Sequence, residues 1–380
     1  MPKKRILLVG DGNHQFIINL SNWLKKQQGE FILVDIFSLT EIKESNKRYY
    51  NECFFVKKNL FKSIFDYVKG LRLFYRFFQY KLLIKRLPNY DAINFHYMVI
   101  DNLFLANQLK KKLDAKIIIS IWGSDMYRLS PKNKGYFIRA CNNADKISFT
   151  NEESLHYFKK KFHWNIENLH IVRFGLAPLE LLKNISKSKL ESKVFLEWNV
   201  SKLAIVIGYN LSPFQQHIKI LECFEKLELN LFKDKIQLIL PITYGGSDDY
   251  KMQLLEKLNN LPFEFKIYDE FLTDEKVAYI RKASDVMIQL QTTDQFSGSM
   301  QEHLYTGSIV ITGAWLPYQT IKKEGAWFVE INNIEQLVKV LPDVLNNFNE
   351  YKKKTFNTPQ AIANLSLWEN NIKNWLTLYN

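Results

Sequence analysis

The sequence predicts an α/β protein built from two doubly wound parallel-sheet domains. With 380 residues, the chain is too long for one ordinary core and suits two domains. Short apolar runs rich in β-branched residues alternate with stretches whose apolar residues recur at helical spacing. This alternation pauses once, in the Lys- and Ser-rich segment 178–202, and then restarts. We interpret the pause as a connection between domains.

The expected first domain covers residues 1–185. It begins with the apolar run ILLVG at 6–10, which predicts a strand, and continues through a polar turn into a helical pattern. A further helix is expected over about 151–161. The other strands expected in this domain are 31–37, 91–98, 115–123, 145–150 and 169–175.

The expected second domain covers residues 200–355 and repeats the pattern, with a helix over about 213–227. Its expected strands are 203–210, 236–242, 263–269, 286–291 and 308–313. Residues 356–380 predict a terminal helix, which we expect to pack on the first domain. Ligands of such sheets bind at the carboxyl ends of strands, so we look for site residues just after strands, facing a cleft between the domains.

Composition narrows the partners and the compartment. The formal net charge of +13 favours an anionic partner such as nucleic acid, a phospholipid surface or a phosphorylated small molecule. Cys53, Cys141 and Cys223 form no C-x-x-C pair, which argues against a disulfide framework or a zinc site. No stretch is long enough to span a bilayer, and the run at 6–10 is too short for a signal peptide. We expect a cytoplasmic protein, with a peripheral position on the inner face of the membrane as a further expectation.

Two carboxylates, Asp294 and Glu302, flank a small-residue turn just after an expected strand. The turn predicts a helix N-terminus, with Ser297 or Ser299 as N-cap, and such a terminus can bind a diphosphate. Glu302 could accept hydrogen bonds from a ribose diol, and Asp294 would lie nearer a sugar. The alternative is a capped turn with two solvated acids. The residues proposed for this turn are Ser297, Gly298, Ser299 and Met300.

The segment DQFSGSMQEHLYTGSIV (294–310) resembles the E-x7-E region of family 4 glycosyltransferases, which have the GT-B fold. The usual form is E-G-F-G-x-x-x-x-E-A-x-A-x-G-x-P-V. Phe296 and Gly307 match that form, whereas Asp294 replaces its first Glu, Ser297 its second Gly and Ile309 its Pro.

Other segments resemble the same family. IWGSDMY (121–127) is similar to its H-G-x-D segment, with Trp122 in place of the His, and IVIGYNLSPFQQHIKIL (205–221) is similar to its V-G-R-L-x-x-x-K-G region. In that region Tyr209 and Gln216 replace an Arg and a Lys that normally neutralise the donor diphosphate. Together with LPITYGG, GYNLSPFQQH also resembles bacterial fucosamine-type transferases, including 4-acetamido-4,6-dideoxygalactose transferases.

The resemblance implies a metal-independent glycosyltransferase, without a cofactor, that moves a sugar from a nucleoside-diphosphate donor to a glycan or lipid-linked acceptor in surface polysaccharide or glycolipid assembly. It implies that Glu302 holds the ribose and Asp294 the sugar. Stereochemistry stays open, since the spacing favours retention and the fucosamine-type likeness favours inversion. Arg173, His217 and Lys219 are candidates for charge stabilisation, and Asn210, Ser212, Tyr244 and Gly245 for further donor contacts. Each has a plain alternative as a packing, turn or surface residue.

On the acceptor side, Asp11, Asn13 and His14 follow the first strand, and the alternative is a polar turn. Asp125 matches the family's aspartate and is a candidate for contact with the sugar or acceptor, with a buried capping role as its rival. The base is expected near Tyr268 and Phe271.

Segment 54–87 interleaves aromatic and cationic residues. It fits an anionic membrane surface or single-stranded nucleic acid, or helices that pack their rings inward with cations outward. No nucleic-acid module accompanies it, so we expect no nucleic-acid partner. Two rival functions stay open: a GT-B nucleotide-sugar epimerase or hydrolase, and a non-catalytic GT-B binding or scaffold protein.

Overall fold

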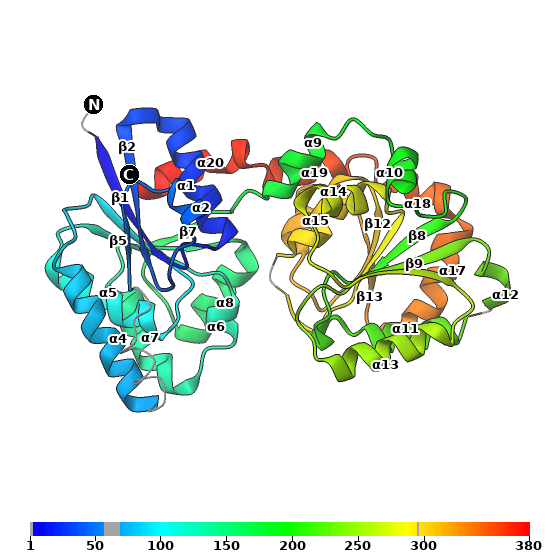
Figure 1. The fold of residues 1–380 in the computed structure, drawn as a ribbon, viewed down its shortest axis with the longest axis horizontal. Coiled ribbons are helices and arrows are strands. Elements are labelled where there is room, and N and C mark those ends of the chain that lie inside the picture. The colour runs from blue at the N-terminus through cyan, green and yellow to red at the C-terminus, as the bar shows by residue number, and fades with distance from the viewer. Residues whose placement is uncertain (1–2, 57–68, 228, 295) are drawn as a thin grey trace. The chain divides into compact units, whose positions relative to one another are not determined.

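A computed structural model describes residues 3–56, 69–227, 229–294 and 296–380. The chain divides into two compact units, which we describe separately (Figure 1). Unit 1 comprises Met1–Gly175 and Trp368–Asn380, and unit 2 comprises Leu176–Leu367. Each contains one parallel sheet with helices, so the predicted fold of two doubly wound α/β domains is confirmed.

The described part of unit 1 contains a seven-stranded parallel sheet in the order β3-β2-β1-β4-β5-β6-β7. The strand order reverses at β1: β2 and β3 lie on one side of this strand, and β4 and the later strands lie on the other. The strands are β1 (Lys4–Gly10), β2 (Ile32–Ser38), β3 (Cys53–Phe55), β4 (Ala92–His96), β5 (Lys116–Ser120), β6 (Lys146–Phe149) and β7 (Leu169–Ile171). The helices are α1 (Gln15–Gln28), α2 (Glu44–Lys47), α4 (Lys69–Ile84), α5 (Ile100–Lys112), α6 (Ser124–Tyr127), α7 (Lys134–Asn142), α8 (Glu152–Phe162) and α20 (Trp368–Tyr379).

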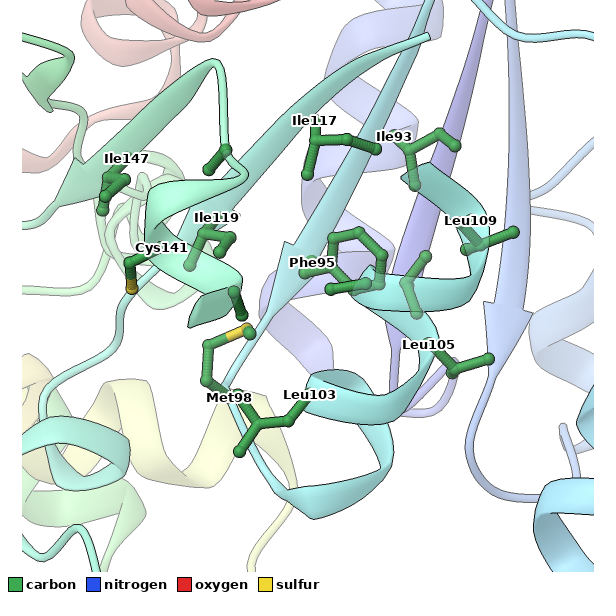
Figure 2. Packing of buried hydrophobic residues seen from close by; sticks show 14 of the residues in the cluster. Ile93, Phe95, Met98, Leu103, Leu105, Leu109, Ile117, Ile119, Cys141 and Ile147 are labelled. Carbon is green, nitrogen blue, oxygen red and sulfur yellow. The ribbon is translucent and has the colours of Figure 1, made fainter. Parts of the chain in front are cut away.

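The core of unit 1 lies on both faces of this sheet. On one face, Ile93 and Phe95 of β4 and Ile117 and Ile119 of β5 pack against Leu105 and the other apolar residues of α5 (Figure 2). On the other face, α1 and α20 contribute to a second cluster that includes the buried rings of Trp368 and Trp375. The expected packing of the last helix on the first domain is therefore confirmed.

The described part of unit 2 contains a six-stranded parallel sheet in the order β10-β9-β8-β11-β12-β13. The strands are β8 (Leu203–Ile207), β9 (Ile236–Pro241), β10 (Glu264–Tyr268), β11 (Val286–Gln289), β12 (Ile309–Gly313) and β13 (Val329–Ile331). The helices are α9 (Ala177–Asn184), α10 (Lys189–Phe195), α11 (His217–Glu225), α12 (Leu229–Phe232), α13 (Asp248–Asn259), α14 (Asp274–Ala283), α15 (Gly298–Tyr305), α16 (Gln319–Lys323), α17 (Leu337–Asn346), α18 (Phe348–Lys354) and α19 (Thr358–Ser366). Since β8 pairs with β9 on one side and β11 on the other, the strand order reverses between β8 and β11.

The boundaries of the two units differ from the domain boundaries that the sequence predicted. The helix α9, placed by the sequence in the first domain, packs against α14 of unit 2. The expected terminal helix over 356–380 is two helices, because α19 packs against α15 in unit 2 whereas α20 belongs to unit 1. Among the residues given a structure, no helix is long and apolar enough to cross a membrane.

Candidate functional site

The loops after β8 and β11 meet at the point where the strand order of unit 2 reverses, which is where ligands of such sheets bind. The Tyr209 hydroxyl donates to Gln291 Oε1 (3.4 Å), and Gln215 Nε2 donates to the same oxygen (3.0 Å). Gln216 Nε2 donates to the backbone oxygen of Leu290 (2.6 Å). The two positions where the resembled family carries cations thus hold neutral side chains that tie these loops together.

The helix α15 begins beside this point, and its N-cap is Ser297 rather than Ser299. Ser297 Oγ accepts a hydrogen bond from the Met300 backbone N–H (3.2 Å), which fixes the first turn. Met300 is fully buried in the core, so only its backbone is a candidate for ligand contact. Ser299 is also buried, and its hydroxyl has no partner among the described residues.

Glu302 lies one turn into α15 and is anchored through one carboxylate oxygen. Its Oε2 accepts a hydrogen bond from Arg281 Nε of α14 (2.8 Å), and the two side chains are only 9% and 8% exposed. Arg281 Nη1 also lies 3.3 Å from His303 Nε2, so the guanidinium is fixed on two sides. The other oxygen, Oε1, has no hydrogen-bond partner among the described residues; it faces Gly298, where a Cβ would lie 3.8 Å away. Glu302 therefore presents one oriented acceptor beside the first turn of α15.

Asp294, on the turn before α15, is oriented by a buried tyrosine. Tyr318 donates from its hydroxyl to Asp294 Oδ2 (2.5 Å), and Tyr318 is 1% exposed. Burial and the neighbouring Asp294 raise the pKa of Tyr318 well above its usual value, so this phenol stays a donor at neutral pH. Asp294 itself is half-buried. The structure thus places both carboxylates of the motif on α15 or the turn before it, each with a buried partner that fixes its direction.

The loops after β8 and β9 pack closely on each other. Asn210 Oδ1 accepts from the Ser212 N–H (3.0 Å), and Ser212 Oγ accepts from the Phe214 N–H (3.4 Å), so both side chains stabilise the turn. The Leu211 N–H donates to the backbone oxygen of Tyr244 (2.7 Å). Gly245 has φ +96°, and its missing Cβ would lie 3.4 Å from the Ser212 nitrogen. This turn therefore packs on the neighbouring loop, and contact of Tyr244 and Gly245 with a nucleotide stays a prediction.

His217 and Lys219, both on α11, have different environments. His217 is fully buried, its Nδ1 lies 3.3 Å from the Tyr250 hydroxyl, and burial lowers its pKa to about 4. Without a bound anion the ring is therefore neutral at neutral pH, and its contact with a donor phosphate stays a prediction. Lys219 is exposed.

The two residues expected near the nucleotide base differ in their exposure to solvent. Tyr268 is buried, and its hydroxyl accepts from Trp198 Nε1 (2.8 Å), which leaves it inside the core. Phe271 is 88% exposed in the loop after β10, where its ring can stack on a planar group.

In unit 1, the polar residues after β1 build the loop in which they lie. Asp11 Oδ1 accepts from the Asn13 N–H (3.0 Å) and from the Thr40 hydroxyl (2.6 Å). Asn13 Oδ1 accepts from the Lys43 N–H (2.9 Å), which ties the loop to the next segment. His14 is the N-cap of α1 through Nδ1, and its ring centroid lies 4.7 Å from that of Trp122. Burial lowers the pKa of His14. A role for Asp11, Asn13 and His14 in binding the acceptor substrate stays a prediction.

Asp125 is buried and joins two loops at the carboxyl ends of β4 and β5. Its oxygens accept from the backbone N–H groups of Met98 (2.9 Å), Gly123 (2.8 Å) and Trp122 (3.1 Å). Burial raises its pKa to about 6, although these hydrogen bonds oppose the shift. The structure therefore gives Asp125 a positioning role for Trp122.

Arg173, which follows β7, donates from Nε to the backbone oxygen of Thr150 (3.1 Å). Its own backbone oxygen accepts from Trp375 Nε1 (2.9 Å). Its assignment to charge stabilisation stays a prediction. No group of three or more His, Cys, Asp or Glu side chains suited to a metal ion occurs among the residues described here.

Two residues of this site were missed by sequence reasoning. Arg281 and Tyr318 hold the two carboxylates of the motif, yet they lie 21 and 24 positions away from them in the chain. Arg281 is one of three cations on α14, with Lys276 and Lys282, and its residue type alone does not mark it as buried. Only its position, on the helix preceding β11, could have indicated a place beside α15.

Comparisons with known proteins agree with this architecture. A family model described as glycosyl transferase 4-like matches residues 5–151. That match falls in unit 1, whereas the most specific motifs of the sequence lie in unit 2. No protein of curated function matches the chain.

Solved structures match the chain over nearly its whole length. A glycosyltransferase from Rickettsia africae ESF-5 is 15% identical, with a TM-score of 0.78 over 100% of this chain and 98% of the other. Anabaena Alr3699/HepE in complex with UDP and glucose is 12% identical, with a TM-score of 0.74 over 98% of each chain. Sucrose-phosphate synthase from Thermosynechococcus elongatus is 13% identical, with a TM-score of 0.71 over 99% and 98%. At these identities the similarity shows the fold, which is the two-sheet GT-B fold.

Proposed function

We propose that the chain is a glycosyltransferase whose unit 2 binds a nucleoside-diphosphate sugar. The observation that carries this proposal is the pair Arg281–Glu302, in which Arg281 holds one carboxylate oxygen and the other is left without a partner. A vicinal diol donates two hydrogen bonds that a single oriented carboxylate can accept. The ribose of a nucleotide carries such a diol, which makes Glu302 its binding residue.

The rest of the donor would extend from Glu302 along the first turn of α15. The N-terminus of this helix carries a partial positive charge, and such termini bind diphosphates through their backbone N–H groups. Anabaena HepE was solved with UDP and with UDP-glucose, which makes UDP the first nucleotide to test.

Transfer requires that the bond between the anomeric carbon and the diphosphate oxygen breaks and that the acceptor oxygen bonds to that carbon. The acceptor proton passes to the leaving diphosphate or to solvent. The leaving diphosphate gains negative charge, which the α15 N-terminus would stabilise without reorganisation. Asp294, held by Tyr318, would orient the sugar. We assign no metal ion and no cofactor to this reaction.

The acceptor that we propose is a glycan or a lipid-linked sugar in surface polysaccharide or glycolipid assembly. The likeness to fucosamine-type transferases and the stereochemical outcome stay predictions. A second candidate is a binding protein without turnover, favoured by the neutral Tyr209 and Gln216 where the resembled family has cations.

A calorimetric titration with UDP tests the proposal on wild type and on Glu302→Gln, which keeps the size of the side chain but removes its charge. We expect wild type to bind UDP and the variant to bind about tenfold or more weakly, because hydrogen bonds to charged groups are worth about 1.5–3 kcal/mol. Glu256→Gln, an exposed acid on α13, is the matched control. Release of UDP from UDP-glucose only on addition of an acceptor supports transfer. Release without one points to a hydrolase, and binding without release points to the binding protein.

A further inference from the structure

The helix α4 lies at the periphery of unit 1 (Figure 1) and carries an exposed apolar stripe. Phe74, Phe78 and Leu82 follow each other at intervals of four residues, so their side chains lie on one face of the helix. Their exposed fractions are 74%, 50% and 41%. Soluble proteins seldom leave large side chains exposed in such a row.

The opposite face of α4 is firmly packed, which fixes the direction of the stripe. The ring of Phe77 stacks on that of Phe104 with centroids 4.0 Å apart. The buried Tyr80 donates to Asp101 Oδ1 (3.0 Å), and Arg76 Nε lies 2.7 Å from the same oxygen. These contacts with α5 leave no freedom for the helix to turn its apolar stripe inward.

Cations flank the stripe and have no acidic counterpart. Lys81, Lys85 and Arg86 are exposed, and none of them has an ion-pair partner among the described residues. The sequence from Phe74 to Leu87 contains no Asp or Glu. Lys112 of α5 donates to the backbone oxygen of Ile84, which brings the Lys-rich end of α5 beside this end of α4.

We propose that this face of α4 docks on a membrane surface that contains anionic phospholipids. The side chains of Phe74, Phe78 and Leu82 would enter the boundary between headgroups and acyl chains, and Lys81, Lys85 and Arg86 would pair with lipid phosphates. Charge complementarity selects this partner, because an uncharged protein surface would satisfy the rings but not the cations. The proposal stands on the surface of unit 1 alone and does not depend on the proposed function. The sequence had assigned such a surface to 54–87, of which 57–68 lies outside the described residues.

Sedimentation of the full-length protein with lipid vesicles tests this proposal. Wild type should bind phosphatidylcholine vesicles rich in phosphatidylglycerol, and bind pure phosphatidylcholine much more weakly. Raising the salt from about 0.1 M to about 0.5 M should weaken binding, since it screens exposed charges. Absence of vesicle binding, or equal binding to both vesicles, would overturn the proposal.

Two variants separate the contributions of the rings and the cations. Phe74→Ser/Phe78→Ser/Leu82→Ser should lower the partition coefficient at least about tenfold. Lys81→Ala/Lys85→Ala should lower it about fivefold for each cation on anionic vesicles and leave it unchanged on neutral ones. Phe31→Ser, which removes an exposed ring elsewhere in unit 1, is the control and should bind like wild type.

Thermal unfolding and UDP affinity should be unchanged in these variants, because the substituted side chains are exposed and lie outside the candidate site. If the triple variant instead converts a dimer of the wild type into a monomer and leaves vesicle binding intact, a second copy covers the stripe and the membrane proposal is wrong. If only single-stranded oligonucleotide binding is lost, the partner is nucleic acid and the proposal is equally wrong.

Discussion

Truncation of Glu302 to alanine should affect both the stability of unit 2 and its affinity for a nucleotide. The Arg281–Glu302 pair is almost completely buried, with Nε and Oε2 2.8 Å apart. Removing one partner of a buried pair leaves the other charge without compensation, which costs about 3–5 kcal/mol. Glu302→Ala should therefore lower the free energy of unfolding by about that amount, measured by urea denaturation.

The double variant Arg281→Met/Glu302→Leu separates stability from binding. Replacing a buried pair by apolar residues of similar size is often neutral or stabilising, so most of the lost stability should return. UDP affinity should not return, because the carboxylate that accepts the ribose hydroxyls is absent. We expect about a 10- to 150-fold weaker Kd than wild type, from the worth of hydrogen bonds to a charged group. A double variant that is stable and binds UDP as wild type does would refute the reasoning.

Three further predictions follow from the site. Tyr318→Phe removes only the hydroxyl that holds Asp294. UDP affinity should stay within about twofold of wild type, whereas the rate of UDP release in the presence of acceptor should fall about tenfold or more. Equal rates in the two proteins would exclude the positioning role of Tyr318. Tyr209→Arg/Gln216→Lys introduces two cations beside the α15 turn, which should tighten UDP binding severalfold and make it more dependent on salt. Calorimetry at two salt concentrations measures both effects, and an unchanged affinity would mean that the diphosphate binds elsewhere. Burial raises the pKa of Asp125 from 3.8 to about 6, so the folded state binds this proton more tightly than the unfolded state. The free energy of unfolding of the wild type should therefore fall by up to about 3 kcal/mol as pH rises from about 4 to 6. Asp125→Asn should lack this fall, and an equal pH dependence of the two proteins in urea denaturation would contradict the prediction.

The strands that matter for the site could be predicted from the sequence, because each is a buried run bounded by a turn. ILLVG and LAIVI both lie within strands, and the predicted run VMIQLQ contains β11. The edge strands β3 and β13 were not predicted, since each has only three residues and is only partly buried, which is too short for a clear strand pattern. The boundary between the units was also misplaced, because α9 and α19 belong where their partners α14 and α15 lie, which local periodicity does not encode.

Those parts of the candidate site that depend on local sequence features could also be predicted. The spacing from Asp294 to Glu302 and the cap at Ser297 are local features that the sequence displays. The partners that orient these carboxylates depend on packing between elements that are distant in the chain, and so do the backbone contacts of Asp125. Residues that looked like ligands from their position after a strand, such as Asn210 and Asp11, satisfy backbone groups of their own loops.

A crystal structure of the protein with UDP would test the central proposal most directly, through the distance from Glu302 Oε1 to the ribose hydroxyls. We predict at least one hydroxyl within hydrogen-bond distance of Oε1, with Arg281 Nε still bound to Oε2 and the diphosphate beside the first turn of α15. A nucleotide bound elsewhere, with Oε1 facing only solvent, would contradict the assignment of Glu302 and leave α15 as a capped structural helix.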